Sequence, residues 1–168
     1  MIWWRPELRV LFVCTANVCR SPLAEAMLRQ RLRALGLGRR VQVRSAGTKV
    51  GQSGRPPDPR VRRLAQEAGF SLGRIRARQV TAAMLREHDF VLAMEPAHLA
   101  ELAVLAAVGA NPCGAQLLGD YRPARWGGDA AIPDPYYSDM QGFSEVFLQI
   151  DQALEGLVDH LRSRLEQP

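Results

Sequence analysis

The feature that most constrains the fold is an alternation of short, β-rich apolar segments with longer segments of helical spacing. Predicted strands cover residues 9–13, 41–44, 89–94 and 116–118. Five helices are predicted. The first begins at Ser21-Pro22, with Ser21 as N-cap and Pro22 as first helical position, and ends at Gly36. The others run from Asp58-Pro59 to Gly69, from Thr81 to near Glu87, from Glu95 to Val108, and from near Phe143 to Leu165. Strands that alternate with helices indicate an α/β fold with a parallel sheet covered on both faces. Ligands of such sheets bind at the carboxyl ends of the strands.

Length and composition predict one domain over residues 1–168. The chain has no internal repeat and no apolar run near the roughly 20 residues that span a bilayer. Its first residues lack the pattern of a signal peptide. Three cysteines are too few and odd in number for a disulfide framework. We therefore expect a soluble, cytoplasmic protein without membrane insertion.

The formal charge of +5 comes almost entirely from arginine, since Lys49 is the only lysine. A basic balance is compatible with nucleic acid, a membrane surface or anionic substrates. No aromatic stripe is interleaved with the basic residues, so we expect no nucleic-acid partner. Most arginines are read as parts of solvated faces.

The chemistry is predicted to lie in the loop Cys14-Thr15-Ala16-Asn17-Val18-Cys19-Arg20-Ser21, which joins the first strand to a helix N-terminus. Backbone N–H groups and the helix dipole favour an anion there, and such a site stabilises a thiolate. Cys14 is then a candidate nucleophile and Arg20 a bidentate phosphate clamp. Ser21 can donate its hydroxyl to the thiolate.

A Cys-x5-Arg spacing alone is a weak signal, because a buried structural cysteine and a surface arginine produce it by chance. The strand before it and the helix after it match the mechanical requirement of a phosphate cradle. The Gly-x4-Gly-Lys-Ser/Thr loop of nucleotide hydrolases is absent from the sequence.

Residues 10–25 (VLFVCTANVCRSPLAE) resemble the signature of low-molecular-weight protein tyrosine phosphatases. Further blocks resemble the family in the same order: residues 45–48 (SAGT), 57–60 (PDPR), 77–79 (ARQ), 89–94 (DFVLAM) and 132–137 (IPDPYY). The resemblance implies a four-stranded parallel sheet flanked by helices, with the phosphate loop after the first strand. It also implies hydrolysis of phosphotyrosine in proteins through a phosphocysteine, with inorganic phosphate as product and no metal or cofactor.

The resemblance assigns the general acid and base to Asp134, which lies between two prolines. Without the resemblance, a turn aspartate before proline is the better explanation of Asp134. Tyr136 and Tyr137 are expected to wall a slot for a phenyl ring. The predicted phosphate site is completed by Thr15, Ala16, Asn17, Val18, Cys19 and Ser21. Ser45 is expected to support the loop from the second strand. The three histidines, His88, His98 and His160, are read as surface or partly buried residues without metal-ligand spacing.

Three positions depart from the family pattern. Ala16 replaces a usual glycine, so the cradle must form without positive φ at this residue. Ile75 replaces a histidine of the loop-supporting network, so Asn17 and Ser45 must be held differently. Gly51 replaces a rim aromatic, which leaves the slot open on that side unless Trp126 fills it.

Three other functions remain open at this point. An arsenate reductase of the same fold needs two further cysteines close in sequence, and only Cys113 lies beyond the loop. A protein arginine phosphatase of the same superfamily carries threonine at the position of Val18, whose two methyls suit a phenyl ring better. A phosphopeptide-binding module would lack the catalytic residues that are present here.

Overall fold

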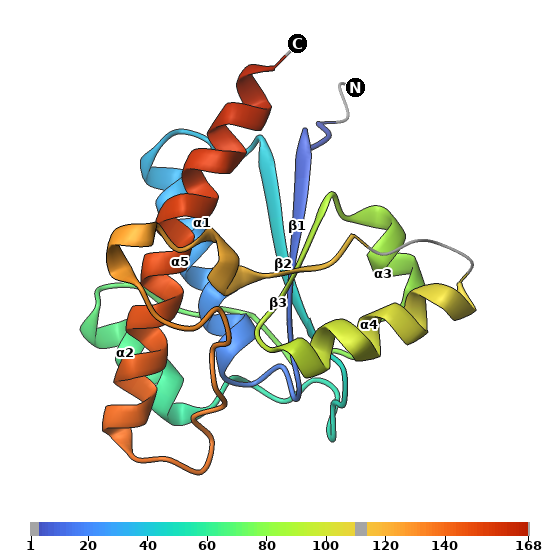
Figure 1. Cartoon of the computed structure of the whole chain (residues 1–168). Helices are drawn as coiled ribbons and strands as arrows, with labels where there is room; N and C mark the ends of the chain where they lie inside the picture. The colour runs from blue at the N-terminus through green and yellow to red at the C-terminus, as the bar shows by residue number, and fades with distance from the viewer. Residues whose placement is uncertain (1–3, 110–113, 168) are drawn as a thin grey trace.

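The computed structural model describes residues 4–109 and 114–167, and it contains one four-stranded parallel sheet (Figure 1). The strands lie in the order β2-β1-β3-β4. Their bounds are Leu8–Cys14 (β1), Val41–Gly47 (β2), Phe90–Ala93 (β3) and Gln116–Leu117 (β4). The predicted α/β fold and parallel sheet are confirmed. Cys113, which mattered for the arsenate reductase alternative, lies outside the described residues.

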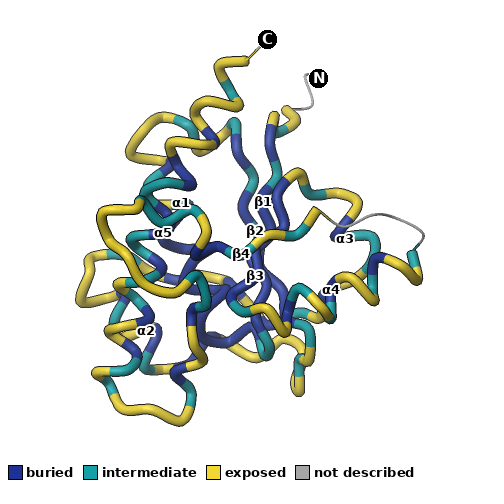
Figure 2. The backbone as a smooth tube through the Cα atoms, in the orientation of Figure 1, coloured by how far each residue is buried: buried dark blue, intermediate teal, exposed yellow. Residues whose placement is uncertain are grey.

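Helices cover both faces of the sheet. In Figure 1, α1 (Arg20–Ala34), α2 (Pro59–Glu67) and α5 (Met140–Glu166) lie on one side, while α3 (Ala82–Glu87) and α4 (Pro96–Val108) lie on the other. Alternate residues of β1 serve the two cores, because side chains along a strand point to opposite faces. Val10 and Phe12 pack with the larger helical layer, and Leu11 and Val13 with the smaller one. Figure 2 shows the strands as the most deeply buried part of the chain.

The end of α1 illustrates how the sequence specifies a boundary. Gly36 has φ +72°, its N–H donates to the carbonyl of Arg33, and the N–H of Leu37 donates to that of Leu32. These two bonds form a Schellman motif, in which the left-handed residue is usually glycine. Gly36 thus ends the helix, as predicted.

Four local predictions were wrong in detail. Ser21 does not cap α1, because the helix already begins at Arg20 and the Ser21 hydroxyl bonds to other partners. The strand β2 continues to Gly47, since β1 pairs with it along its whole length. The predicted loop after β4 contains two 3-10 helices, η1 (Leu118–Tyr121) and η2 (Ala124–Trp126). The last helix begins three residues early, because the Asp139 side chain accepts from the N–H of Gly142 and caps it.

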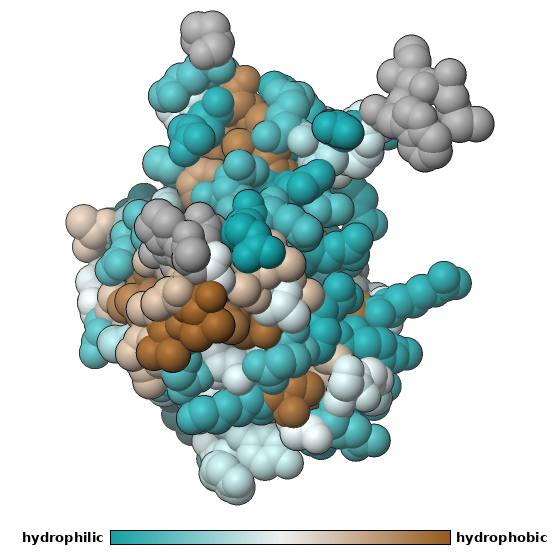
Figure 3. Space-filling model, turned by 90° about the vertical axis from the view of Figure 1, so that its right-hand side faces the viewer, coloured by the Kyte–Doolittle hydropathy of each residue, from teal (hydrophilic) through white to brown (hydrophobic). Residues whose placement is uncertain are grey.

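The outer surface of α4 is unusually apolar. Val104 and Val108 are 68% and 82% exposed. Figure 3 shows hydrophobic surface on this side of the molecule. Among the described residues, no helix combines the length and apolar character that a membrane crossing needs.

Candidate active site

The loop between β1 and α1 turns its carbonyl groups outward. Four of them accept hydrogen bonds of 2.8–3.2 Å from backbone N–H groups outside the cradle. The carbonyl and donor pairs are Cys14 with Thr48, Thr15 with Lys49, Val18 with Asp58, and Cys19 with Leu23. Within the described residues, the N–H groups of residues 16–19 have no acceptor in the protein. These groups, together with the N-terminus of α1, are therefore available to an anion.

Asn17 fixes the conformation of this loop. It has φ +56°, and no other non-glycine residue in the described chain has a positive φ. The expectation that the cradle forms without positive φ at Ala16 is therefore confirmed. Asparagine adopts the left-handed region more readily than most residues. The buried Asn17 side chain donates to the hydroxyls of Ser21 (2.8 Å) and Ser45 (3.0 Å), and its oxygen accepts from the N–H of Arg78 (3.0 Å).

Ser45 is held from the opposite side by a buried carboxyl group. Its hydroxyl donates to Oε2 of Glu25 at 2.5 Å, and Glu25 also pairs with Arg29. Burial raises the pKa of Glu25, and the charge of Arg29 partly offsets this. Ile75 is buried in the larger core and takes no part in these polar contacts. In the sequence analysis Glu25 was only the last residue of the segment 10–25, and that segment gave no sign of this role.

Gly47 lets β2 approach the loop closely. A Cβ at this position would lie 2.5 Å from the carbonyl oxygen of Thr15 and 3.0 Å from the nitrogen of Asn17. A side chain would therefore force the loop away from the strand. This contact explains why glycine stands in the Ser-Ala-Gly-Thr segment.

The thiol of Cys14 lies at the base of the cradle. Its Sγ is 2.9 Å from the hydroxyl oxygen of Ser21, which also lies 3.3 Å from the carbonyl of Ala46. Asn17 donates to the same hydroxyl and so occupies one of its acceptor sites. The Ser21 proton is thereby free to point at Cys14 when the sulfur is a thiolate.

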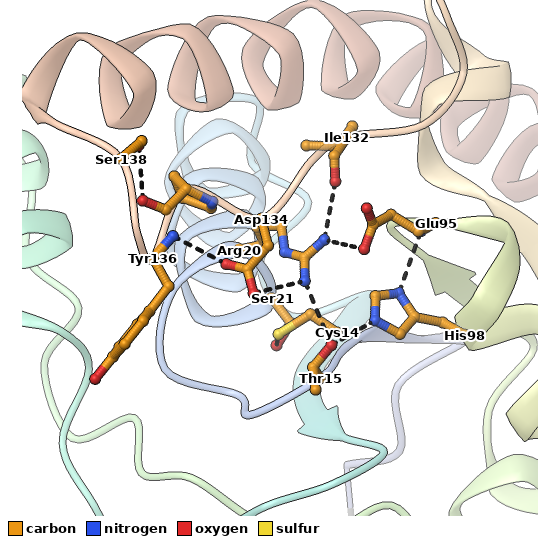
Figure 4. A network of polar contacts seen from close by, with 11 residues as sticks. Cys14, Thr15, Arg20, Ser21, Glu95, His98, Ile132, Asp134, Tyr136 and Ser138 are labelled. Carbon is orange, nitrogen blue, oxygen red and sulfur yellow. Dashed lines mark hydrogen bonds and ion pairs between the residues drawn. The ribbon is translucent and has the colours of Figure 1, made fainter.

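The guanidinium of Arg20 is the centre of a polar network (Figure 4). Arg20 is only 2% exposed. One terminal nitrogen donates to Oε2 of Glu95 at 2.7 Å and to the carbonyl of Ile132 at 3.0 Å. The other lies 3.5 Å from Oγ1 of Thr15 and 3.6 Å from Oδ2 of Asp134. Glu95 and Ile132 thus hold one end of the guanidinium, while its other end faces the cradle and Asp134.

His98 corrects the sequence analysis, which expected a surface or partly buried residue, because it is fully buried. It is 2% exposed, and its Nδ1 accepts from the N–H of Glu95 at 3.2 Å. Its Nε2 therefore carries the proton in the neutral tautomer and donates to Oγ1 of Thr15 at 2.9 Å. Burial lowers the pKa of His98, and the charge of Arg20 lowers it further. A neutral His98 thus ties the cradle to the start of α4.

Asp134 lies above the cradle on an anchored loop. The N–H of Ile132, two residues before it, donates to the carbonyl of Met94 at 2.8 Å. The Oδ1 of Asp134 accepts from the N–H of Tyr136 at 3.1 Å. The side chain remains 46% exposed, so it can meet a substrate.

Arg60 supports the two tyrosines from behind. Its guanidinium pairs with Asp58 (2.9 Å), donates to the carbonyl of Tyr136 (3.0 Å), and lies 5.4 Å from the centroid of the Tyr136 ring. Bonds to Arg60 lower the pKa of Asp58. Tyr136 and Tyr137 pack edge to face with ring centroids 4.9 Å apart. Tyr137 is 97% exposed, so it forms the outer lip rather than a deep wall.

A pocket of about 480 Å³ brings most of the predicted site residues together. It is lined by Cys14, Thr15, Ala16, Val18, Cys19, Arg20, Asp134, Tyr136 and Tyr137. Asn17 and Ser21 do not line it but support the loop from below. Gly51 is at the rim, and Trp126 does not fill this side, because its indole donates to Glu155 instead.

Three rim residues were missed by the sequence analysis: Lys49, Gln52 and Arg55. They come from the Gly- and Pro-rich segment that was read only as a loop. Glu95 and His98 were also missed. Their signal was their place directly after the third strand, because the carboxyl ends of parallel strands share one edge of the sheet.

Cys19 differs from Cys14 in its surroundings. Burial, followed by the negative charge of Asp58, raises the pKa of the Cys19 thiol to about 12. At neutral pH this residue is a thiol rather than a thiolate. Cys19 is therefore the weaker of the two candidate nucleophiles.

Comparison with known proteins places the chain among phosphatases. The family model described as low molecular weight phosphotyrosine protein phosphatase matches residues 9–167. A Streptomyces coelicolor protein named low molecular weight protein-tyrosine-phosphatase is 39% identical over 158 residues, with 94% of this chain and 96% of the relative covered. The crystal structure of YfkJ from Bacillus subtilis has a TM-score of 0.87 and 31% identity, with 97% and 99% covered. The crystal structure of an arginine phosphatase from Drosophila has a TM-score of 0.82 and 34% identity, with 90% and 96% covered.

Proposed function

Because the chain belongs to the low molecular weight phosphotyrosine protein phosphatase family, whose members are phosphoric monoester hydrolases, we propose that it hydrolyses phosphotyrosine in proteins through a phosphocysteine intermediate. The observation that carries this proposal is that one pocket holds the Cys14 sulfur, the Arg20 guanidinium and the Asp134 carboxylate. The proposal extends to one catalytic domain over residues 1–168 that works in the cytoplasm without metal or cofactor and releases inorganic phosphate.

In the first step, the Cys14 thiolate attacks the phosphorus atom. An S–P bond forms, and the bond between phosphorus and the tyrosine oxygen breaks. Asp134, in its protonated form, gives its proton to the leaving phenolate. The N–H groups of residues 16–19 and the free end of Arg20 stabilise the negative charge on the equatorial oxygens.

In the second step, the Asp134 carboxylate takes a proton from water, whose oxygen attacks the phosphocysteine. The S–P bond breaks, phosphate leaves, and the thiolate returns to its contact with Ser21. A hydrogen bond from Ser21 makes the thiolate a better leaving group in this step, because it stabilises negative charge on sulfur.

The test compares wild type with Cys14→Ser on para-nitrophenyl phosphate without added metal. The variant should lose turnover but keep phosphate binding, because the loop amides and Arg20 supply the anion site. Arg20→Lys should lose most of both, since lysine cannot form a bidentate clamp. Near-normal turnover by Cys14→Ser would refute the proposal.

A second candidate is phosphoarginine hydrolysis, which the likeness to the Drosophila arginine phosphatase supports. Val18 lines the pocket and is 3% exposed, so it offers two methyls and no hydrogen bond. A buried guanidinium nitrogen left unpaired costs about 1–3 kcal/mol, which favours phosphotyrosine. The kcat/KM of matched phosphotyrosine and phosphoarginine peptides, for wild type and Val18→Thr, separates the two. Equal kcat/KM values for wild type would show that the preference for phosphotyrosine is wrong.

A further inference from the structure

A second cavity, of about 630 Å³, lies at the other end of the sheet from Cys14. It is bounded by the C-terminal half of α1, the turn over residues 36–39, and residues 41–44 of β2. In Figure 1 this region is at the upper end of the molecule, beside the start of β2, whereas the phosphate loop is at the lower end. Arg20 and Arg33 stand 13 positions apart on α1, which corresponds to about 20 Å.

Four arginines line this cavity: Arg29, Arg33, Arg39 and Arg44. Arg29 is engaged, since it pairs with the buried Glu25 and donates to the carbonyl of Val43 at 2.8 Å. Within residues 4–109 and 114–167, the other three form no ion pair. The cavity therefore carries more positive charge than its own carboxylates balance.

The state of Arg29 agrees with this excess. Burial lowers its pKa, and although Glu25 opposes the shift, the charges of Arg44 and Arg33 lower the pKa further. The guanidinium groups thus repel one another, and an added anion relieves that repulsion. Each guanidinium offers a planar fork that fits a carboxylate.

The floor between the arginines is apolar. Leu32, Val41 and Val43 are buried beneath the cavity, and Trp4, which is 55% exposed, stands at its side. A site for a small inorganic anion needs no such floor. A ligand that fills it has apolar side chains as well as negative charges.

The turn over residues 36–39, which bounds the cavity between α1 and β2, is rigidly held before any ligand binds. The Schellman bonds at Gly36 fix the turn, and the N–H of Arg40 donates to the carbonyl of Leu37 at 2.9 Å. A Cβ on Gly38 would lie 3.2 Å from Cγ of Arg33, so glycine permits the turn to pack on that arginine. Binding here does not have to order the turn first.

The open side of the cavity is a strand edge. β2 is one of the two edge strands of the sheet. On the side of β2 that faces away from β1, the N–H of Gly47 donates to the carbonyl of Arg78, and its carbonyl accepts from the N–H of Val80. Alternate residues of a strand point their backbone groups the same way, so the N–H of Val43 also points outward. An extended chain laid along this edge meets a backbone donor and the arginines together.

We propose that this groove binds an extended acidic segment of a partner protein in which carboxylates alternate with apolar side chains. The carboxylates pair with Arg33, Arg39 and Arg44. The apolar side chains pack against Trp4 and over the small apolar surface that Leu32, Val41 and Val43 leave at the floor. This binding does not depend on the catalytic role of Cys14.

The test measures the fluorescence anisotropy of a labelled peptide of alternating Glu and Leu residues with the full chain. A peptide of the same composition with its Glu and Leu residues in two blocks is the ligand control. Arg33→Gln/Arg44→Gln should weaken binding about 100-fold, roughly tenfold for each of the two lost arginine contacts. Arg62→Gln/Arg74→Gln removes the same charge from other exposed arginines and should bind as wild type does. Turnover of para-nitrophenyl phosphate should be unchanged in both variants, which checks their folding.

Three outcomes would overturn the proposal. The first is no binding of the alternating peptide by wild type, which would mean that the arginines only prevent unwanted pairing at an exposed strand edge. The second is equal weakening by both double variants, which would mean general charge attraction. The third is equal binding of the block peptide or of inorganic polyphosphate, which would mean that the apolar floor and strand edge select nothing.

Discussion

Asn17 gives a quantitative test of how the phosphate loop is held, because glycine and alanine remove different parts of its contribution. Both substitutions delete three hydrogen bonds, those to Ser21, Ser45 and the N–H of Arg78. At about 1 kcal/mol each, the loss is about 3 kcal/mol of unfolding free energy. Glycine adopts φ +56° freely, whereas alanine pays about 1–2 kcal/mol for the left-handed region. We expect losses of about 3 kcal/mol for Asn17→Gly and about 4–5 kcal/mol for Asn17→Ala.

The assay is urea unfolding followed by tryptophan fluorescence, combined with kcat/KM on para-nitrophenyl phosphate. Activity should fall at least about tenfold in both variants, because a freed Ser21 hydroxyl no longer points at Cys14. Gln52→Ala is the control, since it removes an exposed amide at the pocket rim and should change stability by less than about 0.5 kcal/mol. A loss below about 1 kcal/mol for Asn17→Ala, or equal losses for the two variants, would refute the reasoning.

Three further predictions follow from the same site. Asp134→Asn should lose most activity on phenyl phosphates with poor leaving groups and less on activated esters; equal loss on both would make Asp134 structural. Mild peroxide should oxidise Cys14 to a sulfenic acid, which the Cys19 thiolate attacks to form a reversible Cys14–Cys19 disulfide. The disulfide should form faster as pH rises, because the pKa of Cys19 is about 12 and more of it becomes thiolate. Peptide mapping that finds Cys14 as sulfinic acid and Cys19 untouched would contradict this. His98 has a lowered pKa in the folded state, so the unfolded state binds its proton more readily, and stability should fall as pH drops below about 6.5; His98→Gln should flatten that dependence in urea titrations, and an unchanged slope would contradict it.

Local sequence was sufficient to predict the loop from Cys14 to Ser21, because strand, turn and helix are contiguous there. The start of α1 was misplaced for the same local reason. Ser21 before Pro22 has the pattern of an N-cap, but its hydroxyl is engaged by Cys14 and Asn17. Capping statistics carry no information about such tertiary partners.

The support of Arg20 and of the loop could not be read locally. His98 contacts Thr15 across 83 positions in the chain, and Glu95 contacts Arg20 across 75. Only the parallel sheet brings the end of β3 beside the end of β1. Lys49 and Arg55 reach the pocket from an irregular segment, for which hydrophobic periodicity has no signal.

The central claim is that phosphate passes through Cys14, and acid quench during turnover of a phosphotyrosine peptide tests it most directly. Peptide mass spectrometry and phosphorus NMR of the quenched protein should find one phosphoryl group on sulfur at Cys14. With para-nitrophenyl phosphate, whose leaving group needs little protonation, Asp134→Asn should accumulate more of it, because the water that cleaves the S–P bond loses its base. Phosphate on another residue, or undiminished turnover with no phosphoryl enzyme in either protein, would contradict the account.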